Sequence, residues 1–215
     1  MKEFRQKCTA IWRRHGQTIV NVVVFIAIGR WIAAYTIDKW QKGILWDFVE
    51  IAFLIHNLIM LALILVRRPH LAIDRSLFHQ AVALAAFFSG LAFRDTITAN
   101  QALLTASRAV TGAAAILGIL TLINLGRSFG ILISVRKIRT DWLYRIVRHP
   151  MYLTDILWKV GMILKKPSLL NAGIMAFGVA CYVYRALLEE KFLSQYPEYR
   201  RYMTKVRYRF IPGLF

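Results

Sequence analysis

Residues 44–66 read ILWDFVEIAFLIHNLIMLALILV, an almost unbroken apolar run. A membrane-spanning helix needs about 20 mostly apolar residues, so this stretch predicts one span. The chain contains further runs of the same kind at 18–37, 76–93, 102–125, 151–164 and 168–188. The run 151–164 is short, and Lys165-Lys166-Pro167 separates it from the next one. We therefore expect an all-α fold, a polytopic transmembrane helix bundle of five or six spans.

Composition supports the membrane assignment. The chain has 215 residues, of which 58% are hydrophobic, and its mean hydropathy is +0.48. These values are too apolar for an ordinary soluble domain of this length. The net charge of +18 raises the alternative of nucleic-acid binding. However, the basic residues lie between the apolar runs and form no stripe interleaved with aromatic residues, which argues against a nucleic-acid partner.

The distribution of Lys and Arg predicts the orientation. If there are six crossings, four segments share one side of the membrane: 1–17, 67–75, 127–150 and 185–215. Together they hold 21 of the 29 basic residues. Because basic residues are enriched in cytoplasmic loops, this bias predicts that both termini are cytoplasmic.

Ionisable residues within the apolar runs need partners or a polar cavity, because a charge at membrane depth is costly. For Glu50 we expect an ion pair with Arg30 or Arg108, or a place in a substrate pocket. Asp155 and Lys159 are four residues apart. They either form a salt bridge on one helix surface or line a polar chamber.

The cysteines indicate neither a metal centre nor a disulfide. Cys8 and Cys181 are far apart and lack metal-ligand or redox spacing. Cys181 lies inside an apolar run, which is typical of a packed thiol. We expect no metal site.

The C-terminal third contains an ordered set of polar motifs. Arg148-His149-Pro150-Met151-Tyr152 precedes the run 151–164, and Glu189-Glu190 follows the last run. Pro150 favours a helix start, which places His149 beside a helix N-terminus with unpaired N–H groups. If the last two runs form a hairpin, both carboxylates return beside His149. The result would be a polar pocket at the membrane surface, suited to a zwitterionic, partly cationic cofactor from the cytosol.

These motifs, with the ending Arg209-Phe210-Ile211-Pro212, resemble the isoprenylcysteine carboxyl methyltransferase family. That family lies in a wider group with the membrane phospholipid N-methyltransferases. The resemblance covers roughly residues 125–212 and implies an integral membrane methyltransferase that uses S-adenosyl-L-methionine without a Rossmann domain. It also implies a division into N-terminal transmembrane helices (1–125) and a methyltransferase-like region with a cytoplasmic tail and cofactor site (126–215).

The resemblance implies roles for particular residues. Those expected to bind the cofactor are His149, Pro150, Tyr152, Glu189, Glu190, Tyr199 and Tyr202. The candidates for the chemical step are Arg148, Glu190 and Arg207. A carboxylate acceptor would need an arginine to hold it, whereas an amine or thiol would need a base such as Glu190, Glu189 or His149. Asp155, Lys159 and Arg209 are the candidates for the substrate pocket.

The expected acceptor is a lipidic or lipidated molecule that enters from the bilayer between the spans. The alternatives are a small amine, a thiol or a phospholipid head group, and a non-catalytic membrane scaffold or small transporter. The lipid-amine branch typically has a glycine where this chain has Leu153-Thr154-Asp155. That difference points away from the lipid-amine branch. The sequence does not predict the oligomeric state.

Overall fold

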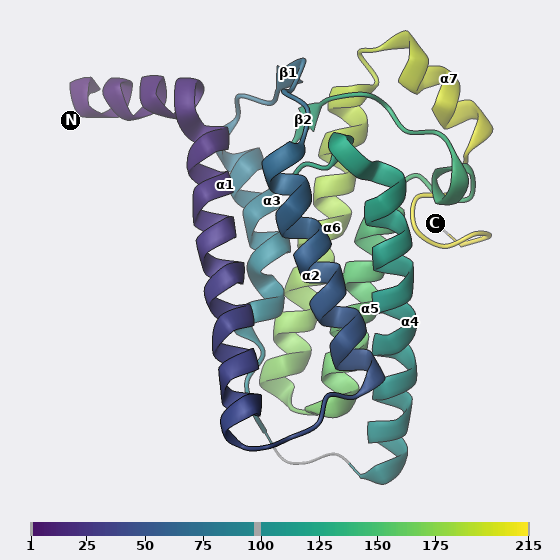
Figure 1. Cartoon of the computed structure of the whole chain (residues 1–215). Helices are drawn as coiled ribbons and strands as arrows, with labels where there is room; N and C mark the ends of the chain where they lie inside the picture. The colour runs from purple at the N-terminus through teal and green to yellow at the C-terminus, as the bar shows by residue number, and fades with distance from the viewer. Residues whose placement is uncertain (1, 97–99, 215) are drawn as a thin grey trace.

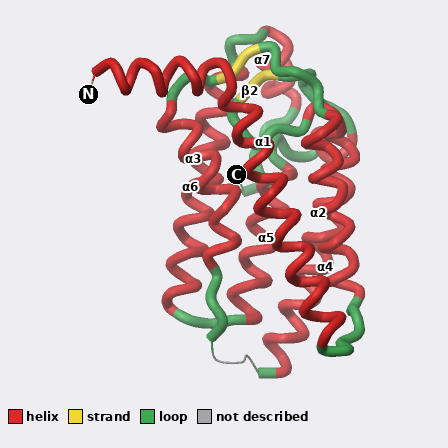
Figure 2. Tube along the Cα trace, turned by 60° about the vertical axis from the view of Figure 1, so that its left-hand side comes forward, coloured by secondary structure: helices red, strands yellow, loops and turns green. Residues whose placement is uncertain are grey.

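The computed structural model describes residues 2–96 and 100–214. Six helices run side by side as a bundle, and a seventh lies across one end (Figure 1). The start of α1 turns away from the bundle at the same end, as both views show (Figure 2). The helices are α1 (Lys2–Gln41), α2 (Phe48–Val66), α3 (Leu77–Phe88), α4 (Gln101–Leu125), α5 (Pro150–Lys165), α6 (Leu169–Leu193) and α7 (Pro197–Lys205).

Short elements connect these helices. Three 3-10 turns are η1 (Ser89–Ala92), η2 (Gly126–Ser128) and η3 (Trp142–Arg145). The strands β1 (Ala72–Ile73) and β2 (Ser134–Val135) pair antiparallel, with Ala72 opposite Val135. This small pairing is the one departure from the expected all-α fold among the described residues. It ties the α2–α3 connection to the long connection between α4 and α5.

The helix starts follow local sequence signals. Asp47 caps α2, and it forms a reciprocal capping box with Glu50, the third residue of the helix. Ser168 caps α6 by accepting a hydrogen bond from the N–H of Asn171. Pro150 occupies the first position of α5, where its missing N–H has no intrahelical partner to lose.

Four of the described helices are long and apolar enough to cross a membrane. They are Thr18–Gln41, Phe48–Val66, Gln101–Ser128 and Leu169–Leu193. The apolar segment Leu77–Ala92 and helix α5, with 16 residues, are shorter. Both shorter helices nevertheless pack inside the bundle, α3 against α6 and α5 against α4 and α6. The protein is thus a multi-pass integral membrane protein.

Close approach between helices depends on small residues. A Cβ atom at Gly118 of α4 would lie 2.6 Å from the His56 Nδ1 atom of α2. A Cβ atom at Gly161 of α5 would collide with the Thr111 side chain of α4. In lipid, helices associate through such close packing rather than through hydrophobic exclusion from water. These contacts place α5 against α4 and therefore fix where its N-terminus, with Pro150, emerges.

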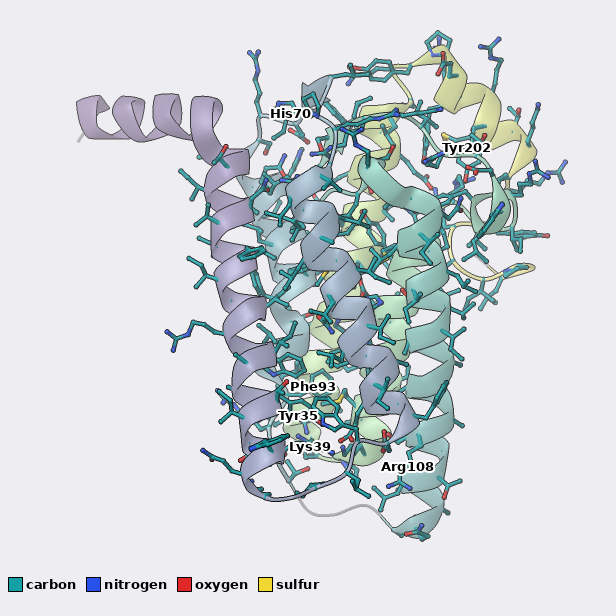
Figure 3. All side chains as sticks on the ribbon, in the orientation of Figure 1. Tyr35, Lys39, His70, Phe93, Arg108 and Tyr202 are labelled. Carbon is teal, nitrogen blue, oxygen red and sulfur yellow. The ribbon has the colours of Figure 1, made fainter. Side chains whose placement is uncertain are left out.

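The ionisable residues of the first two helices pair differently from the prediction. Glu50 forms an ion pair with Lys39 and accepts a hydrogen bond of 2.6 Å from the Tyr35 hydroxyl. Neither Arg30 nor Arg108 is its partner. Tyr35 and Lys39 lie at the end of the bundle away from α7 (Figure 3). Glu50 is thus paired, as expected, but the predicted partners are wrong, because Lys39 and Tyr35 come from the last turns of α1.

Basic connections gather at the end that carries α7, which we call the pocket end. The β1–β2 pairing and the α4–α5 connection both lie there (Figure 1). Gln80 of α3, 1% exposed, fixes the α4–α5 connection to the bundle. Its side chain donates to the Ile133 carbonyl (3.1 Å) and accepts from the Ile133 N–H (2.9 Å). This connection can therefore form one wall of a site.

Candidate functional site

A pocket at this end lies between the α4–α5 connection, the start of α5, the end of α6 and α7. It therefore unites segments that are far apart in the sequence. Tyr202 of α7, one of its lining residues, is labelled in Figure 3. The polar side chains that line it include Arg136, Lys137, Arg139, Tyr144, Arg148, His149, Tyr152, Glu189, Tyr199 and Tyr202.

Glu190 is the centre of a buried ion-pair network. One carboxylate oxygen accepts from Arg148 Nε at 2.7 Å and lies 3.1 Å from His149 Nε2. The other oxygen accepts from Arg209 Nε at 3.0 Å. Glu190 is only 4% exposed. Because both oxygens are engaged, this carboxylate positions other groups and does not itself line the pocket.

Glu189, the preceding residue, lines the pocket. Its carboxylate accepts a hydrogen bond from the Tyr152 hydroxyl and lies 4.0 Å from His149 Nδ1. The His149 and Tyr152 rings stack with centroids 5.1 Å apart. The two acidic residues of the predicted pair therefore have different surroundings, and only Glu189 faces the pocket.

The C-terminal segment after α7 is held over this network. The Arg148 and His149 N–H groups donate to the carbonyls of Tyr208 and Arg209, both at 2.9 Å. The Arg148 guanidinium also donates to the Val206 and Arg207 carbonyls. Arg148 thus holds the tail through hydrogen bonds to its main-chain carbonyls. The Arg207 side chain is exposed, so only its carbonyl takes part.

Two tyrosines of α7 form another wall. Tyr199 and Tyr202 are buried, and the Tyr202 hydroxyl donates to the Tyr144 carbonyl at 2.7 Å. Burial raises the pKa of both phenols above the ordinary value, and the nearby Glu190 charge acts in the same direction. Both side chains are therefore neutral at physiological pH. They offer aromatic surface to a bound cation.

Arg185 is a buried residue that the sequence reasoning did not assign to the site. It is 3% exposed and donates to the Ile131 carbonyl at 2.6 Å. Its guanidinium carbon lies 4.8 Å from the centre of the Tyr152 ring. Arg185 therefore connects the α4–α5 connection with the tyrosine that holds Glu189. The sequence did carry a signal for this residue. Arg185 lies inside an apolar run, one helical turn before the acidic pair Glu189-Glu190.

The basic side chains of the α4–α5 connection were also missed as site residues, because their charge was interpreted only as topology. Arg136, Lys137 and Arg139 line the pocket. Arg136 is anchored, with Nε donating to the Arg68 carbonyl at 3.0 Å and Nη1 to Ser134 Oγ at 2.6 Å. The available signal was the short basic cluster Arg136-Lys137-Ile138-Arg139.

Asp155 and Lys159 lie deeper in the bundle. Asp155 accepts a hydrogen bond of 2.8 Å from the Tyr182 hydroxyl, and Lys159 Nζ lies 4.8 Å from the centre of the Tyr182 ring. Tyr182 of α6 therefore contacts both side chains, and the direct salt bridge, one of the two expected alternatives, is not formed in the described structure. The Tyr182 and Tyr152 rings are 5.3 Å apart, which connects this pair to the pocket wall.

The fold and the pocket define a class: a multi-pass membrane protein with a polar site, lined by both signs of charge, at one end of its bundle. Residues 96–198 match the model of the phospholipid methyltransferase family. The segment is thus similar to the phospholipid methyltransferases, a family in the wider group that also contains the isoprenylcysteine carboxyl methyltransferases. The protein is accordingly an S-adenosylmethionine-dependent membrane methyltransferase. No curated protein matches the chain.

The matched segment contains α4, α5 and α6 and reaches the second residue of α7. It starts before residue 126, the boundary predicted for the methyltransferase-like region. The match is to the phospholipid family, although the glycine expected for that branch is replaced by Leu153-Thr154-Asp155.

The pocket residues fit S-adenosylmethionine. The cofactor carries a sulfonium and an ammonium, and such cations bind to carboxylates and aromatic faces. Glu189 supplies a carboxylate at the pocket, and Tyr152, Tyr199 and Tyr202 supply aromatic rings. The donor set thus suits a cationic ligand.

Proposed function

We propose that this protein methylates the amine of a phospholipid head group. The observation that carries the proposal is Glu189, a carboxylate that faces a pocket at the end of a membrane bundle whose central helices match the phospholipid methyltransferase family. A lipid head group lies at the membrane surface, and so would the pocket end. A lipidated carboxylate, the acceptor of the isoprenylcysteine branch, has less support because the family match is to the phospholipid branch.

In this proposal the cofactor is held by Glu189 and by the rings of Tyr152, Tyr199 and Tyr202. Bound S-adenosylmethionine supplies an activated methyl group. The Glu190 network holds His149 and Arg148 in place, and Arg148 and Arg209 fasten the tail. Positioning the reactants and excluding water are the main tasks of the protein in such a transfer.

The acceptor amine must lose its proton before its lone pair can react, since an ammonium is no nucleophile. Glu189 is the candidate base because it faces the pocket, whereas Glu190 is engaged with Arg148, His149 and Arg209. The Glu189 carboxylate would accept the proton from the head-group ammonium. The Tyr152 hydroxyl, which donates to Glu189, would keep it oriented. Asp155 and Lys159 would lie beyond Tyr152, toward the acceptor's entry from the bilayer.

The proposal includes the orientation in which the pocket and both termini face the cytosol, where the cofactor is made. The basic segments 67–75 and 127–150 meet at the pocket end, as the positive-inside rule requires of cytoplasmic loops. Protease treatment of sealed vesicles tests this orientation. Cleavage after Lys205 from the cytosolic face supports it, and cleavage only from the other face overturns it.

A methyl-transfer assay tests the function. The purified protein is reconstituted in phosphatidylcholine vesicles with radiolabelled S-adenosylmethionine, and phosphatidylethanolamine, a prenylcysteine analogue or an alkyl thiol is added. We expect label in the phosphatidylethanolamine product, its loss in Glu189→Gln, and its retention in Glu198→Gln, which removes an exposed carboxylate of α7. Label in the prenylcysteine or thiol product alone would overturn the proposed acceptor.

A further inference from the structure

We propose that Lys137 and Arg139 form an anion subsite that holds the phosphodiester of the lipid acceptor. This inference rests on the proposed function and names the part of the site that recognises the head group. Both side chains come from the α4–α5 connection and line the same pocket as Glu189. The ammonium and the phosphate of one head group would then meet opposite charges on different walls.

The charge balance of the lining supports an anionic ligand. Among the described lining residues, the basic side chains are Arg136, Lys137, Arg139 and Arg148, and Glu189 is the carboxylate. Arg148 is already neutralised by Glu190 at 2.7 Å. Three cationic side chains therefore face one carboxylate. Charges of one sign close together in a partly buried pocket favour the binding of a counter-ion.

The three surplus cations differ in their freedom to bind a ligand. Arg136 is engaged with the Arg68 carbonyl and with Ser134. In contrast, Arg139 Nε is buried without a hydrogen-bond partner among the described residues. Lys137 is exposed at the rim of the pocket. A buried donor without a partner needs an acceptor, and an arginine fork fits two oxygens of a phosphate.

The cofactor accounts for Glu189 and the tyrosines but not for the surplus positive charge of the pocket. S-adenosylmethionine carries two positive groups and one carboxylate, so it is a net cation at neutral pH. Added cationic side chains would weaken its binding unless another anion shares the pocket. A phosphodiester carries the missing negative charge. The cofactor carboxylate is the other anion that could meet these side chains, and the experiment must separate the two.

The test measures ligand binding without turnover. Full-length protein in phosphatidylcholine nanodiscs is titrated with spin-labelled phosphatidylglycerol, which has the phosphodiester but no amine to methylate. The variant is Lys137→Gln/Arg139→Gln. The matched control is Arg200→Gln/Arg201→Gln, which removes the same charge from exposed positions on α7. S-adenosylmethionine affinity is measured by calorimetry in all three proteins.

We expect lipid binding about tenfold weaker in the Lys137/Arg139 variant, because charge-assisted hydrogen bonds are lost. Lipid binding by the control should match wild type, and cofactor affinity should fall in neither variant. Equal lipid loss in variant and control would mean general surface attraction and overturn the subsite. Loss of cofactor affinity with unchanged lipid binding would assign the side chains to the cofactor carboxylate and also overturn it.

The outcome is separable from that of the proposed function. If no phospholipid amine is methylated but the lipid-binding difference holds, the acceptor assignment fails and the subsite stands. If phosphatidylethanolamine is methylated and the double variant binds and turns over lipid as wild type does, the subsite fails alone.

Discussion

Arg148 Nε lies 2.7 Å from Glu190 Oε1 in a buried ion pair. The same guanidinium donates through Nη1 to the Val206 and Arg207 carbonyls, so the pair connects α6 to the end of the chain. This relationship separates the roles of the two adjacent acidic residues. Glu190 holds the structure that surrounds the pocket, and Glu189 is left facing the pocket.

Glu190→Gln should destabilise the protein. The change leaves Arg148 and Arg209 without their carboxylate, and removing one partner of a buried ion pair costs about 3–5 kcal/mol. Thermal unfolding in detergent should show a lower Tm, and limited proteolysis should cleave the chain after residue 205 faster than in wild type. Glu198→Gln is the control, since its carboxylate is exposed. An unchanged Tm in Glu190→Gln would contradict the structural role.

Glu189→Gln should leave stability nearly unchanged but weaken cofactor binding. The glutamine carbonyl can still accept from the Tyr152 hydroxyl, while the negative charge at the pocket is lost. A charge-assisted contact contributes about 1.5–3 kcal/mol, so we expect affinity for S-adenosylmethionine to fall at least about tenfold. Calorimetry in detergent gives the affinity. If this variant binds S-adenosylmethionine with wild-type affinity, Glu189 does not contact the cofactor.

Arg185→Met should lower both stability and activity, because it leaves the Ile131 carbonyl without its donor and the Tyr152 ring without its cation. An unsatisfied buried carbonyl costs about 1–3 kcal/mol. Compared with Arg185→Met, the variant Arg185→Lys keeps the positive charge but lacks the planar guanidinium with its several donors.

The kinetic comparison distinguishes a positioning role from a purely structural one. With Arg185→Lys we expect a Tm close to wild type and a kcat that falls more than KM changes, since Tyr152 and Glu189 are less well held. If kcat recovers fully whenever Tm recovers, Arg185 serves stability alone.

Alkaline pH should destabilise the packing of Tyr199 and Tyr202 of α7 against the pocket. Burial raises the folded-state pKa of Tyr199 and Tyr202 above the unfolded value of about 10. A raised pKa contributes stability that is present below the unfolded pKa and is lost as pH rises through the folded one. Tyrosinate absorbance of these residues should therefore appear only together with alkaline unfolding. The difference between wild type and Tyr199→Phe/Tyr202→Phe identifies their signal, and early ionisation in the folded protein would contradict their burial.

Sequence alone determined the membrane character and much of the helix layout. The length of an apolar run can be read from the local sequence, and about 20 apolar residues are enough to cross the bilayer. Hydropathy by itself therefore locates the spans at 44–66 and 102–125. The start of α5 at Pro150 followed from the same local chemistry. The hairpin of α5 and α6 then brought Glu189 beside His149, as expected from the order of the motifs.

Only the tertiary structure decided which side chains meet. Hydropathy does not encode the rotation of a helix about its axis, so Glu50 pairs with Lys39 rather than with Arg30 or Arg108. One residue of shift along α6 turns the side chain by about 100°, which is why Glu189 faces the pocket and Glu190 faces Arg148. The path of a long connection is likewise set by non-local contacts such as Gln80 with Ile133, and that path carries Lys137 and Arg139 to the pocket.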